Sequence, residues 1–377
     1  MRGASDKQTG GARAEQSPMS AFHAAHASGE TWQECVARCS GRLGRPGGGL
    51  GFVYFTEALV PYAAPIVESL REQTGVSDWI GTVGIGIIAS GTEYLDEPAL
   101  AVMVAGLSAD QYQIFSGRAR LAGGAPAHFG VIHADPRTPD VAELIADMSS
   151  KVASGFLVGG LSSSRTRTVQ VANEVISGGL SGAVLAASVG VSTRLTQGCA
   201  ALPGRYRVTG CEANVISTLD GRPALEVMKE AIGEMLARDL GRAAHFIHVG
   251  LPVAGSDRGD YLVRNLVGID PDQGLIAIGD LVEPGADLLF CKRDAESARR
   301  DLRRILSELR EELPGRARGA LYYSCIGRGE NMFGSRGAEL ALVKEALGEM
   351  PLAGFFCNGE ISHDRLYGYT GVLTLFH

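Results

Sequence analysis

Two glycine-flanked loops near the end of the chain carry the side chains best suited to chemistry. Each loop follows an apolar run and presents a thiol beside charged or amide groups: Cys325, Arg328 and Asn331 in SCIGRGENMFG (324–334), and Cys357, Asn358 and Glu360 in GFFCNGE (354–360). Glycines allow backbone N–H groups to approach a ligand closely. An arginine and a glutamate in one pocket can hold the carboxylate and the ammonium group of a zwitterion. The loops therefore predict a small-ligand site, and the open alternative is an internal Arg328–Glu360 ion pair that only shapes them.

Catalysis by these thiols is the less favoured interpretation. A nucleophilic cysteine needs a neighbouring base, which is usually a histidine. His363 follows Glu360 closely in sequence, so Cys325 and His363 are the candidate pair. A small apolar thiol in a strand and a surface histidine explain the same residues. We therefore do not expect an enzyme, and a thiol-dependent enzyme or redox switch built on Cys325 or Cys357 is kept as an alternative.

The sequence gives little indication of a metal site or of a nucleotide-binding loop. Cys35 and Cys39 lie one helical turn apart and could form a metal pair, but no second Cys/His pair follows at zinc-site spacing, so two helix-packing cysteines are the better interpretation. His245 and His248 fall on opposite faces of an expected strand, as do His128 and His133, so neither pair can bind one metal. The sequence has no P-loop motif, and its glycine motifs lack the strand-then-helix setting of a dinucleotide site. We expect no metal and no cofactor, with haem as the alternative because any single histidine could be an axial ligand.

A second loop, GGLSSSRTR at 159–167, combines hydroxyl groups with two arginines. Such a loop could hold an anion. A solvated hairpin explains its composition better, and we interpret it in that way.

The composition indicates a globular protein with no attraction for nucleic acid. The 377 residues are 45% hydrophobic, and the formal net charge is −7. This apolar content excludes a largely disordered chain, and the negative charge gives no electrostatic basis for nucleic-acid binding. The seven cysteines are dispersed, which is typical of free thiols in a reducing compartment. With no secretory signal and no long uncharged apolar run, we expect a cytoplasmic protein that has no membrane span.

Apolar runs and amphipathic segments alternate along the chain, which predicts layered α/β domains. Residues 1–20 are polar and rich in Gly and Ser, and are expected to form a disordered tail. Segments expected to be buried strands include GFVYF (51–55), ALAVMVAGL (99–107), HFGVIHAD (128–135) and SGAVLAASVGVST (181–193). Segments expected to be helical include 31–43, 61–74, 221–241 and 296–313. Because many strands are adjacent in sequence, we predict a mixed α+β fold of two layered domains, 21–200 and 201–377, with mixed or antiparallel sheets flanked by helices.

Several of these segments resemble the FIST family of sensory, intracellular signal-transduction proteins. The resemblance extends from about residue 22 to 376 and is carried by GFVYF, VGIGIIASGTEY, FLVGGLSS, YLVRNLVGID, ALYYSCIGRG and PLAGFFCNGEI. The CIGRG and PLAGFFCNGEI motifs are the most specific of these. The resemblance implies a FIST N-terminal domain over 21–200 and a FIST C-terminal domain over 201–377.

What the resemblance implies about function is a sensor that binds a small ligand, with an amino acid or related metabolite as the expected class. The polar C-terminal positions of the family fall on Arg264, Cys325, Arg328 and Glu360. We expect both arginines to bind an anionic group, Glu360 to orient Arg328 or to meet a cation, and Cys325 and Asn358 to line the wall. The signal would pass to a separate partner protein such as a histidine kinase.

Other functions stay open at this point. Some bacterial members resemble haem-based nitric oxide sensors that act on a histidine kinase, and this alternative needs a buried histidine that the sequence does not single out. A pure interaction scaffold is a further alternative, which predicts no ligand-dependent change in stability.

Overall fold

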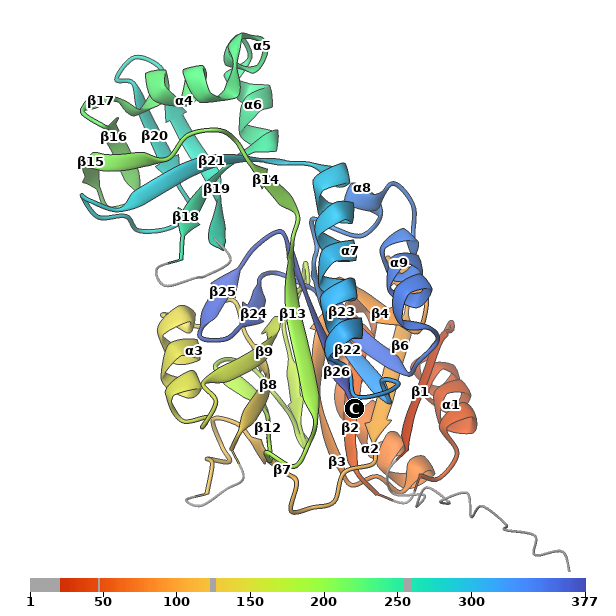
Figure 1. The fold of residues 1–377 in the computed structure, drawn as a ribbon. Coiled ribbons are helices and arrows are strands. Elements are labelled where there is room, and N and C mark those ends of the chain that lie inside the picture. Colours follow the sequence, from red (N-terminus) through yellow and green to blue (C-terminus); the bar gives the residue numbers. More distant parts are fainter. Residues whose placement is uncertain (1–20, 47, 123–126, 254–259) are drawn as a thin grey trace, which may run out of the picture.

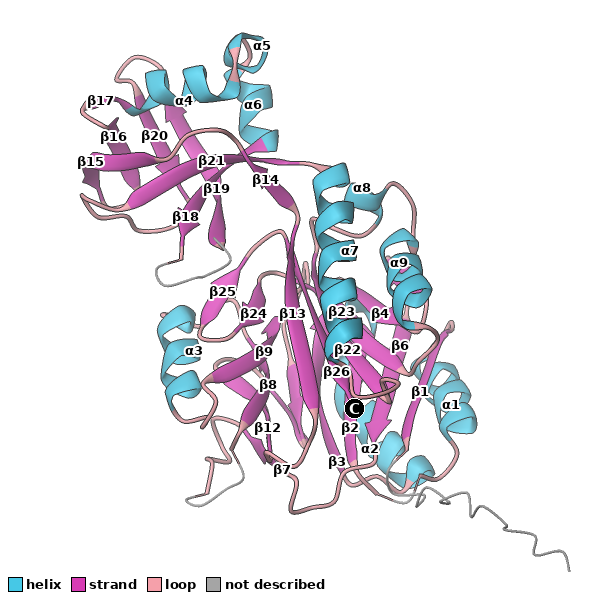
Figure 2. Cartoon of the chain, in the orientation of Figure 1, coloured by secondary structure: helices cyan, strands magenta, loops and turns pink. Residues whose placement is uncertain are grey.

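Four β-sheets form the framework of the protein (Figure 1). The computed structural model describes residues 21–46, 48–122, 127–253 and 260–377, so the tail expected at 1–20 lies outside the described residues. Three sheets have six strands each and the fourth has eight, and helices lie on the outside of the sheets (Figure 2). The expected mixed α+β fold with mixed and antiparallel sheets is confirmed. None of the described helices has the length and apolar character needed to cross a bilayer.

The first sheet is built around two parallel strands joined by a helical crossover. The strands are β2 (Leu50–Thr56) and β3 (Asp78–Gly84), and the crossover contains η2 (Glu57–Tyr62) and α2 (Ala63–Thr74). The sheet is completed by β1 (Phe22–Ser28), β6 (Ala99–Ala105), β10 (Gln170–Ala172) and β11 (Glu174–Ile176). Helix α1 (Trp32–Leu43) packs on β1, and it begins where the Thr31 side chain accepts a hydrogen bond from the Glu34 N–H.

The second and third sheets repeat this plan. In the second sheet the parallel pair and its crossover helix are β8 (Phe129–Ala134), α3 (Val141–Ser150) and β9 (Phe156–Leu161). Its other strands are β7 (Tyr112–Phe115), β12 (Leu180–Leu185), β24 (Glu360–Ser362) and β25 (Arg365–Tyr367). In the third sheet the corresponding elements are β22 (Gly319–Cys325), α8 (Glu330–Phe333), α9 (Ala338–Leu347) and β23 (Leu352–Cys357). Its other strands are β4 (Gly86–Ala89), β5 (Thr92–Leu95), β13 (Val191–Gln197) and β26 (Thr370–Phe376), with α7 (Ala295–Glu312) packed on β13.

The three six-stranded sheets are interlocked, because each parallel pair is followed by a hairpin that joins another sheet. The β4–β5 hairpin follows β3 but pairs with β23, the β10–β11 hairpin follows β9 but pairs with β3, and the β24–β25 hairpin follows β23 but pairs with β9. The second strand of each pair has a glycine at the matching position, where a Cβ would lie 1.7 Å from a carbonyl oxygen of the first strand: Gly81, Gly159 and Gly354. The sequence shows no repeat of fixed period, whereas the structure contains three equivalent units.

The centre of this body holds one polar cluster from matching positions of the three first strands. Tyr54 of β2 lies with its Oη 3.2 Å from His133 Nε2 of β8 and 2.9 Å from Tyr323 Oη of β22. All three side chains are fully buried within the apolar core between the sheets. A buried polar group is stable only when it is hydrogen-bonded, so these contacts tie the three units together at their common core.

The fourth sheet is antiparallel, and its strands come from residues 199–293. Its strands are β14 (Cys199–Ala201), β15 (Tyr206–Glu212), β16 (Val215–Leu219), β17 (Arg222–Pro223), β18 (Ile247–Pro252), β19 (Tyr261–Asp270), β20 (Leu275–Ile278) and β21 (Asp287–Arg293). Because β21 pairs with both β15 and β18, the sheet closes on itself. This unit has its own apolar core and stands apart in Figure 1, where β14 and β21 link it to the rest of the protein.

Two segments expected to be continuous are divided in the structure. The single helix expected at 221–241 is three helices, α4 (Ala224–Ile232), α5 (Glu234–Ala237) and α6 (Leu240–Phe246), because Gly233 takes a φ of 82° that ends α4. The single strand expected at 181–193 is split between β12 and β13, which belong to different sheets. The boundary expected near residue 200 falls where the chain enters the fourth sheet, yet strands from both sides of it pair in the second and third sheets.

Candidate functional site

A cavity of about 290 Å³ lies beside the loop that follows β22. Its wall combines three arginines with two carboxylates: Arg165, Arg328 and Arg336, with Asp96 and Glu330. These residues come from the hairpin after β3, the loop after β9 and the loop after β22, so all three interlocked units contribute to one cavity. The charge pattern suits a small ligand that carries both an acidic and a basic group.

Arg328 is held by a carboxylate that the sequence did not single out. The side chain is completely buried, and its Nε and Nη2 donate hydrogen bonds of 2.8 and 2.6 Å to Glu339 Oε1. Glu339 also accepts hydrogen bonds from the hydroxyls of Tyr322, at 2.6 Å, and Ser324, at 3.2 Å. Burial alone would lower the pKa of Arg328, but the Glu339 carboxylate raises it, so the guanidinium stays charged.

One donor of this guanidinium is left over. Among the described residues, Arg328 Nη1 has no hydrogen-bond partner, although the group lies 5.2 Å above the Phe333 ring and is shielded from solvent. An unsatisfied buried donor on a charged group is costly unless a ligand or an ordered water completes it. Arg328 therefore offers a fixed, charged hydrogen-bond donor in the wall of the cavity.

Glu93 of β5 supplies the complementary acceptor. It is 6% exposed, and its Oε2 has no hydrogen-bond partner within the described ranges. Burial raises the pKa of Glu93 to about 7, with the Glu339 and Glu330 carboxylates acting in the same direction and a hydrogen bond from the Gly337 N–H opposing them. A Cβ on Gly329, in the cavity wall, would lie 3.6 Å from this Oε2. Glu93 Oε2 thus lies close to the cavity wall at Gly329, the residue that follows Arg328.

The two outer arginines of the cavity are paired and half-exposed. Arg165 Nη1 lies 2.7 Å from Glu57 Oε1 and 2.9 Å from Asp96 Oδ1. Arg336 Nε lies 3.3 Å from Glu330 Oε2. Ion pairs at this exposure exchange partners at little cost, so both guanidinium groups can contribute to binding.

Cys325 and Glu360 lie together next to this cavity, but not in the arrangement expected. Glu360 Oε2 accepts hydrogen bonds from the Thr370 N–H and hydroxyl at 3.1 and 2.8 Å, and burial raises the pKa of Glu360 to about 8. Its Oε1 has no partner among the described residues. The prediction that Glu360 orients Arg328 is wrong, because Arg328 Nε and Nη2 donate their hydrogen bonds to Glu339 instead.

The other two expected site residues lie elsewhere. Asn358 is exposed in the turn between β23 and β24, and its backbone N–H donates to the Leu161 carbonyl at 3.1 Å. Arg264 of β19 pairs with Asp280 at 2.7 Å and donates to the Leu366 carbonyl at 3.3 Å, which connects the fourth sheet to β25. Neither residue lines the cavity, so of the five expected residues Arg328 alone does.

The geometry does not favour thiol chemistry. Burial raises the pKa of both Cys325 and Cys357, which disfavours the nucleophilic thiolate. His363 hydrogen-bonds to Asp364 at 2.7 Å and packs its ring against Phe156, so the candidate Cys325–His363 pair does not form.

Two buried histidines bear on the haem alternative, and both pack against aromatic rings. His133 is surrounded by the rings of Tyr54, Tyr323 and Phe355, with centroids 5.5 to 6.3 Å away. His248 is stacked on Tyr369 at 4.4 Å. Burial lowers the pKa of His133 to about 3 and that of His248 to about 4, so both are neutral. The three rings around His133 leave no space for a porphyrin there. Within the described ranges, no group of three or more His, Cys, Asp or Glu side chains could hold a metal ion.

Three residues in or beside the cavity wall were not assigned to the site from the sequence. Glu339 stands in the first turn of a helix, where an acidic residue is ordinary, and Glu93 is an isolated acid in a short hairpin. Arg165 did give a signal, because it belongs to the hydroxyl-rich loop at 159–167 that could hold an anion. The interpretation of that loop as a merely solvated hairpin missed its place in the cavity wall.

The fold and the cavity define a mixed α+β protein with three interlocked units, an additional antiparallel unit and one charged cavity at the loops. The chain matches the FIST N domain over residues 49–222 and the FIST C domain over 224–363, and it belongs to the FIST family of signal-transduction sensors. An uncharacterized protein of Mycobacterium bovis is 32% identical over 335 residues, which cover 83% of this chain and 86% of the relative. An uncharacterized protein of Mycobacterium tuberculosis is 34% identical over 335 residues, which cover 83% of this chain and 87% of the relative.

Proposed function

We propose that this protein is a cytoplasmic sensor that binds a small zwitterion, an amino acid or related metabolite, in the cavity beside Arg328. The observation that carries the proposal is the unused Nη1 donor of a completely buried, permanently charged guanidinium in the cavity wall. A carboxylate of the ligand would complete the hydrogen bonds of Arg328. Charge-assisted hydrogen bonds of this kind contribute about 1.5–3 kcal/mol each.

Glu93 is the side chain that would bind the cationic end of the ligand. The ammonium group of the ligand would donate to Glu93 Oε2, which lies beside Gly329. Arg165 and Arg336 at the outer wall would attract the anionic end, and Asp96 and Glu330 would attract the cationic end. A molecule with only one of the two charges would leave either Arg328 or Glu93 unsatisfied, which favours a zwitterion over a simple acid or amine.

The cavity is placed so that a bound ligand can alter the arrangement of the whole body. Its wall contains residues from all three interlocked units, so a ligand that contacts them favours one arrangement over others. The signal would then reach a separate partner, such as a histidine kinase. Arg264, at the contact between the fourth sheet and β25, is placed to pass a change on to the fourth sheet rather than to touch the ligand.

Isothermal titration calorimetry of the full chain with the twenty common amino acids tests the proposal. We expect at least one to bind, and Arg328→Lys, which keeps the charge beside Glu339 but removes Nη1, to weaken binding at least about tenfold. Glu93→Gln should weaken it similarly. Arg118→Lys is the matched control, since Arg118 is 74% exposed in a surface ion pair with Glu174. Unchanged affinity in both cavity variants, with the fold intact, would show that the site is elsewhere.

A further inference from the structure

We propose that a second pocket, between helix α9 and the β4–β5 turn, binds a small amphipathic carboxylic acid. The pocket has a volume of about 490 Å³ and lies between α9, the α9–β23 loop, the turn after β4 and strand β1. It is distinct from the cavity beside Arg328, with which it shares no lining residue. The inference stands on the geometry of this pocket alone and does not depend on the proposed function.

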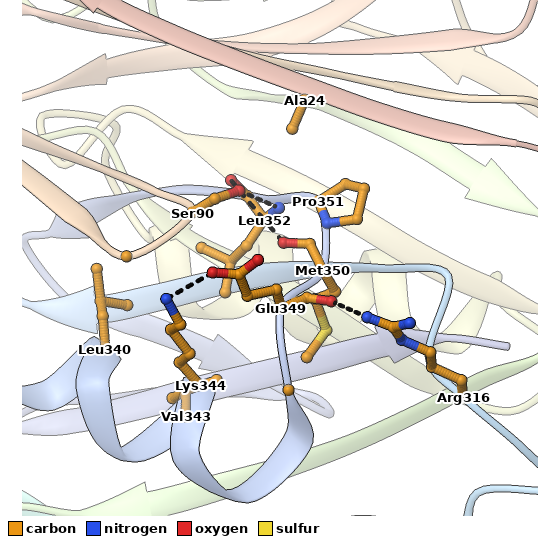
Figure 3. Close-up of a pocket in the computed structure, with 12 residues that line it drawn as sticks. Ala24, Ser90, Arg316, Leu340, Val343, Lys344, Glu349, Met350, Pro351 and Leu352 are labelled. Carbon is orange, nitrogen blue, oxygen red and sulfur yellow. Dashed lines mark hydrogen bonds and ion pairs between the residues drawn. The ribbon is translucent and has the colours of Figure 1, made fainter.

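The interior of the pocket is apolar. Its apolar lining, labelled in Figure 3, consists of Leu340 and Val343 of α9, Met350 of the following loop, Leu352 at the start of β23, and Ala24 of β1 above them. Leu340, Val343 and Leu352 are at most 4% exposed, so the floor is part of the packed core beneath. An alkyl or aryl group of a few carbons would bury its surface here at a gain of about 25 cal/mol per Å².

The pocket is preformed because a serine holds its two walls together. Ser90 Oγ, in the turn after β4, donates a hydrogen bond to the Met350 carbonyl at 3.2 Å and accepts one from the Leu352 N–H at 3.1 Å. These bonds join a hairpin from the first half of the chain to a loop from the second half (Figure 3). A ligand would therefore not need to order this wall when it binds, which lowers the entropic cost of binding.

The rim carries two cations that both contact Glu349, Lys344 at its carboxylate and Arg316 at its backbone carbonyl. Lys344 Nζ lies 2.6 Å from Glu349 Oε1, and Arg316 Nη2 donates to the Glu349 carbonyl at 2.7 Å. The hydrogen bond from Lys344 and the nearby charge of Arg316 keep the pKa of Glu349 below its ordinary value, although the carboxyl end of α9 would by itself disfavour an anion. The local field at the rim therefore favours negative charge.

Glu349 shows where the acidic group of a ligand would bind. Its side chain is 76% exposed, so the Lys344–Glu349 pair is a surface ion pair that can open at little cost. A ligand carboxylate that replaces the Glu349 carboxylate at Lys344 would place its apolar part over Leu340 and Met350. A basic ligand would meet Lys344 and Arg316 instead, so the rim selects an acid.

Titration calorimetry with three probes on the full chain tests this inference. We expect octanoate to bind with a stoichiometry of one, octylamine to bind at least about tenfold more weakly, and acetate not to bind measurably. Octylamine tests whether the rim selects a negative charge, and acetate tests whether the ligand needs an apolar chain to bind. Equal binding of octanoate and octylamine would overturn the inference, because it would indicate adsorption to apolar surface without recognition of the acid.

Two rim variants with opposite expected effects make the test specific. Lys344→Ala should weaken octanoate binding about five- to tenfold, whereas Glu349→Gln should strengthen it about two- to fivefold, because the ligand no longer competes with an internal carboxylate. Lys151→Ala is the matched control, since Lys151 is 54% exposed and pairs with Asp147 on a distant helix. If neither rim variant changes the affinity while the control behaves like the parent protein, the acid does not bind at this rim and the inference is wrong.

Discussion

Arg328 and Glu339 form a completely buried ion pair in which one carboxylate oxygen accepts two hydrogen bonds from the guanidinium, at 2.8 and 2.6 Å. The pair joins the loop after β22 to the first turn of α9. It fixes the guanidinium so that Nη1 remains available in the cavity wall. Because both partners are shielded from water, each depends on the other for its charge to be tolerated.

Removal of one partner of this pair should therefore be severe. We expect Glu339→Ala to lower the free energy of unfolding by about 3–5 kcal/mol, because it leaves the Arg328 charge buried and uncompensated. Urea denaturation followed by circular dichroism measures the change. Glu174→Ala, which breaks an exposed pair with Arg118, should cost less than about 1 kcal/mol. If Glu339→Ala lowers the free energy of unfolding as little as Glu174→Ala does, water reaches the Arg328–Glu339 pair.

Ligand affinity should depend on the protonation of Glu93. Burial places the pKa of Glu93 at about 7, and the carboxylate must be ionised to accept a hydrogen bond from an ammonium group. Affinity for a zwitterion should thus rise as the pH increases from 6 to 8, by at most about tenfold per pH unit below the pKa. Glu93→Gln should abolish this dependence, and calorimetry at several pH values measures both. A pH profile identical in the parent and the variant would contradict the role of Glu93.

Glu360 should make the protein less stable as the pH rises. Its pKa is raised by burial from 4.5 to about 8 in the folded state, so the unfolded chain loses this proton near pH 4.5 and the folded protein keeps it. Protonated Glu360 therefore makes its full contribution to stability below pH 4.5. Between pH 4.5 and about pH 8 this contribution decreases as the pH rises, by at most about 1.4 kcal/mol per pH unit. Unfolding free energies at pH 5, 6.5 and 8 should fall less steeply for Glu360→Gln than for the parent. Parallel curves would show that Glu360 is ionised in the folded protein.

The close approach of the parallel strands should make their glycines irreplaceable. In Gly354→Ala the new Cβ would lie 1.7 Å from the Tyr322 carbonyl oxygen, so the strands must separate at a cost of at least about 3 kcal/mol. Gly315→Ala is the matched control, because a Cβ there has no neighbour within 4 Å. Thermal unfolding compares the two variants. Similar melting temperatures would contradict the tight register of β22 and β23.

The thiols of Cys325 and Cys357 should react slowly in the folded protein. Burial raises the pKa of Cys325 and Cys357, so little thiolate is present at pH 8. Labelling with iodoacetamide, followed by mass spectrometry of the peptides, should modify both residues much more slowly than in urea-unfolded protein. Rapid labelling of Cys325 that is lost in Cys325→Ser would instead favour the thiol-dependent alternative.

The sequence predicted those parts of the fold that depend on local patterns. Apolar runs located β2, β6, β8 and β22, and amphipathic periodicity located α1, α2 and α7. The prediction of one helix at 221–241 was wrong because Gly233 takes a left-handed conformation that interrupts an otherwise suitable pattern. The split of 181–193 was missed because apolar content alone does not indicate that a chain passes from one sheet to another.

By itself, the sequence determined the class of fold, the family and the importance of the loop that contains Arg328. These follow from composition, from periodicity and from motifs that are contiguous in the chain. Only the tertiary structure decided that Glu339 holds Arg328, that Arg165 lines the cavity while Glu93 lies beside its wall at Gly329, and that Asn358 and Arg264 lie away from it. The physical reason is that hairpins exchange between the three sheets. Residues far apart in the chain become neighbours through long-range strand pairing, which no local pattern records.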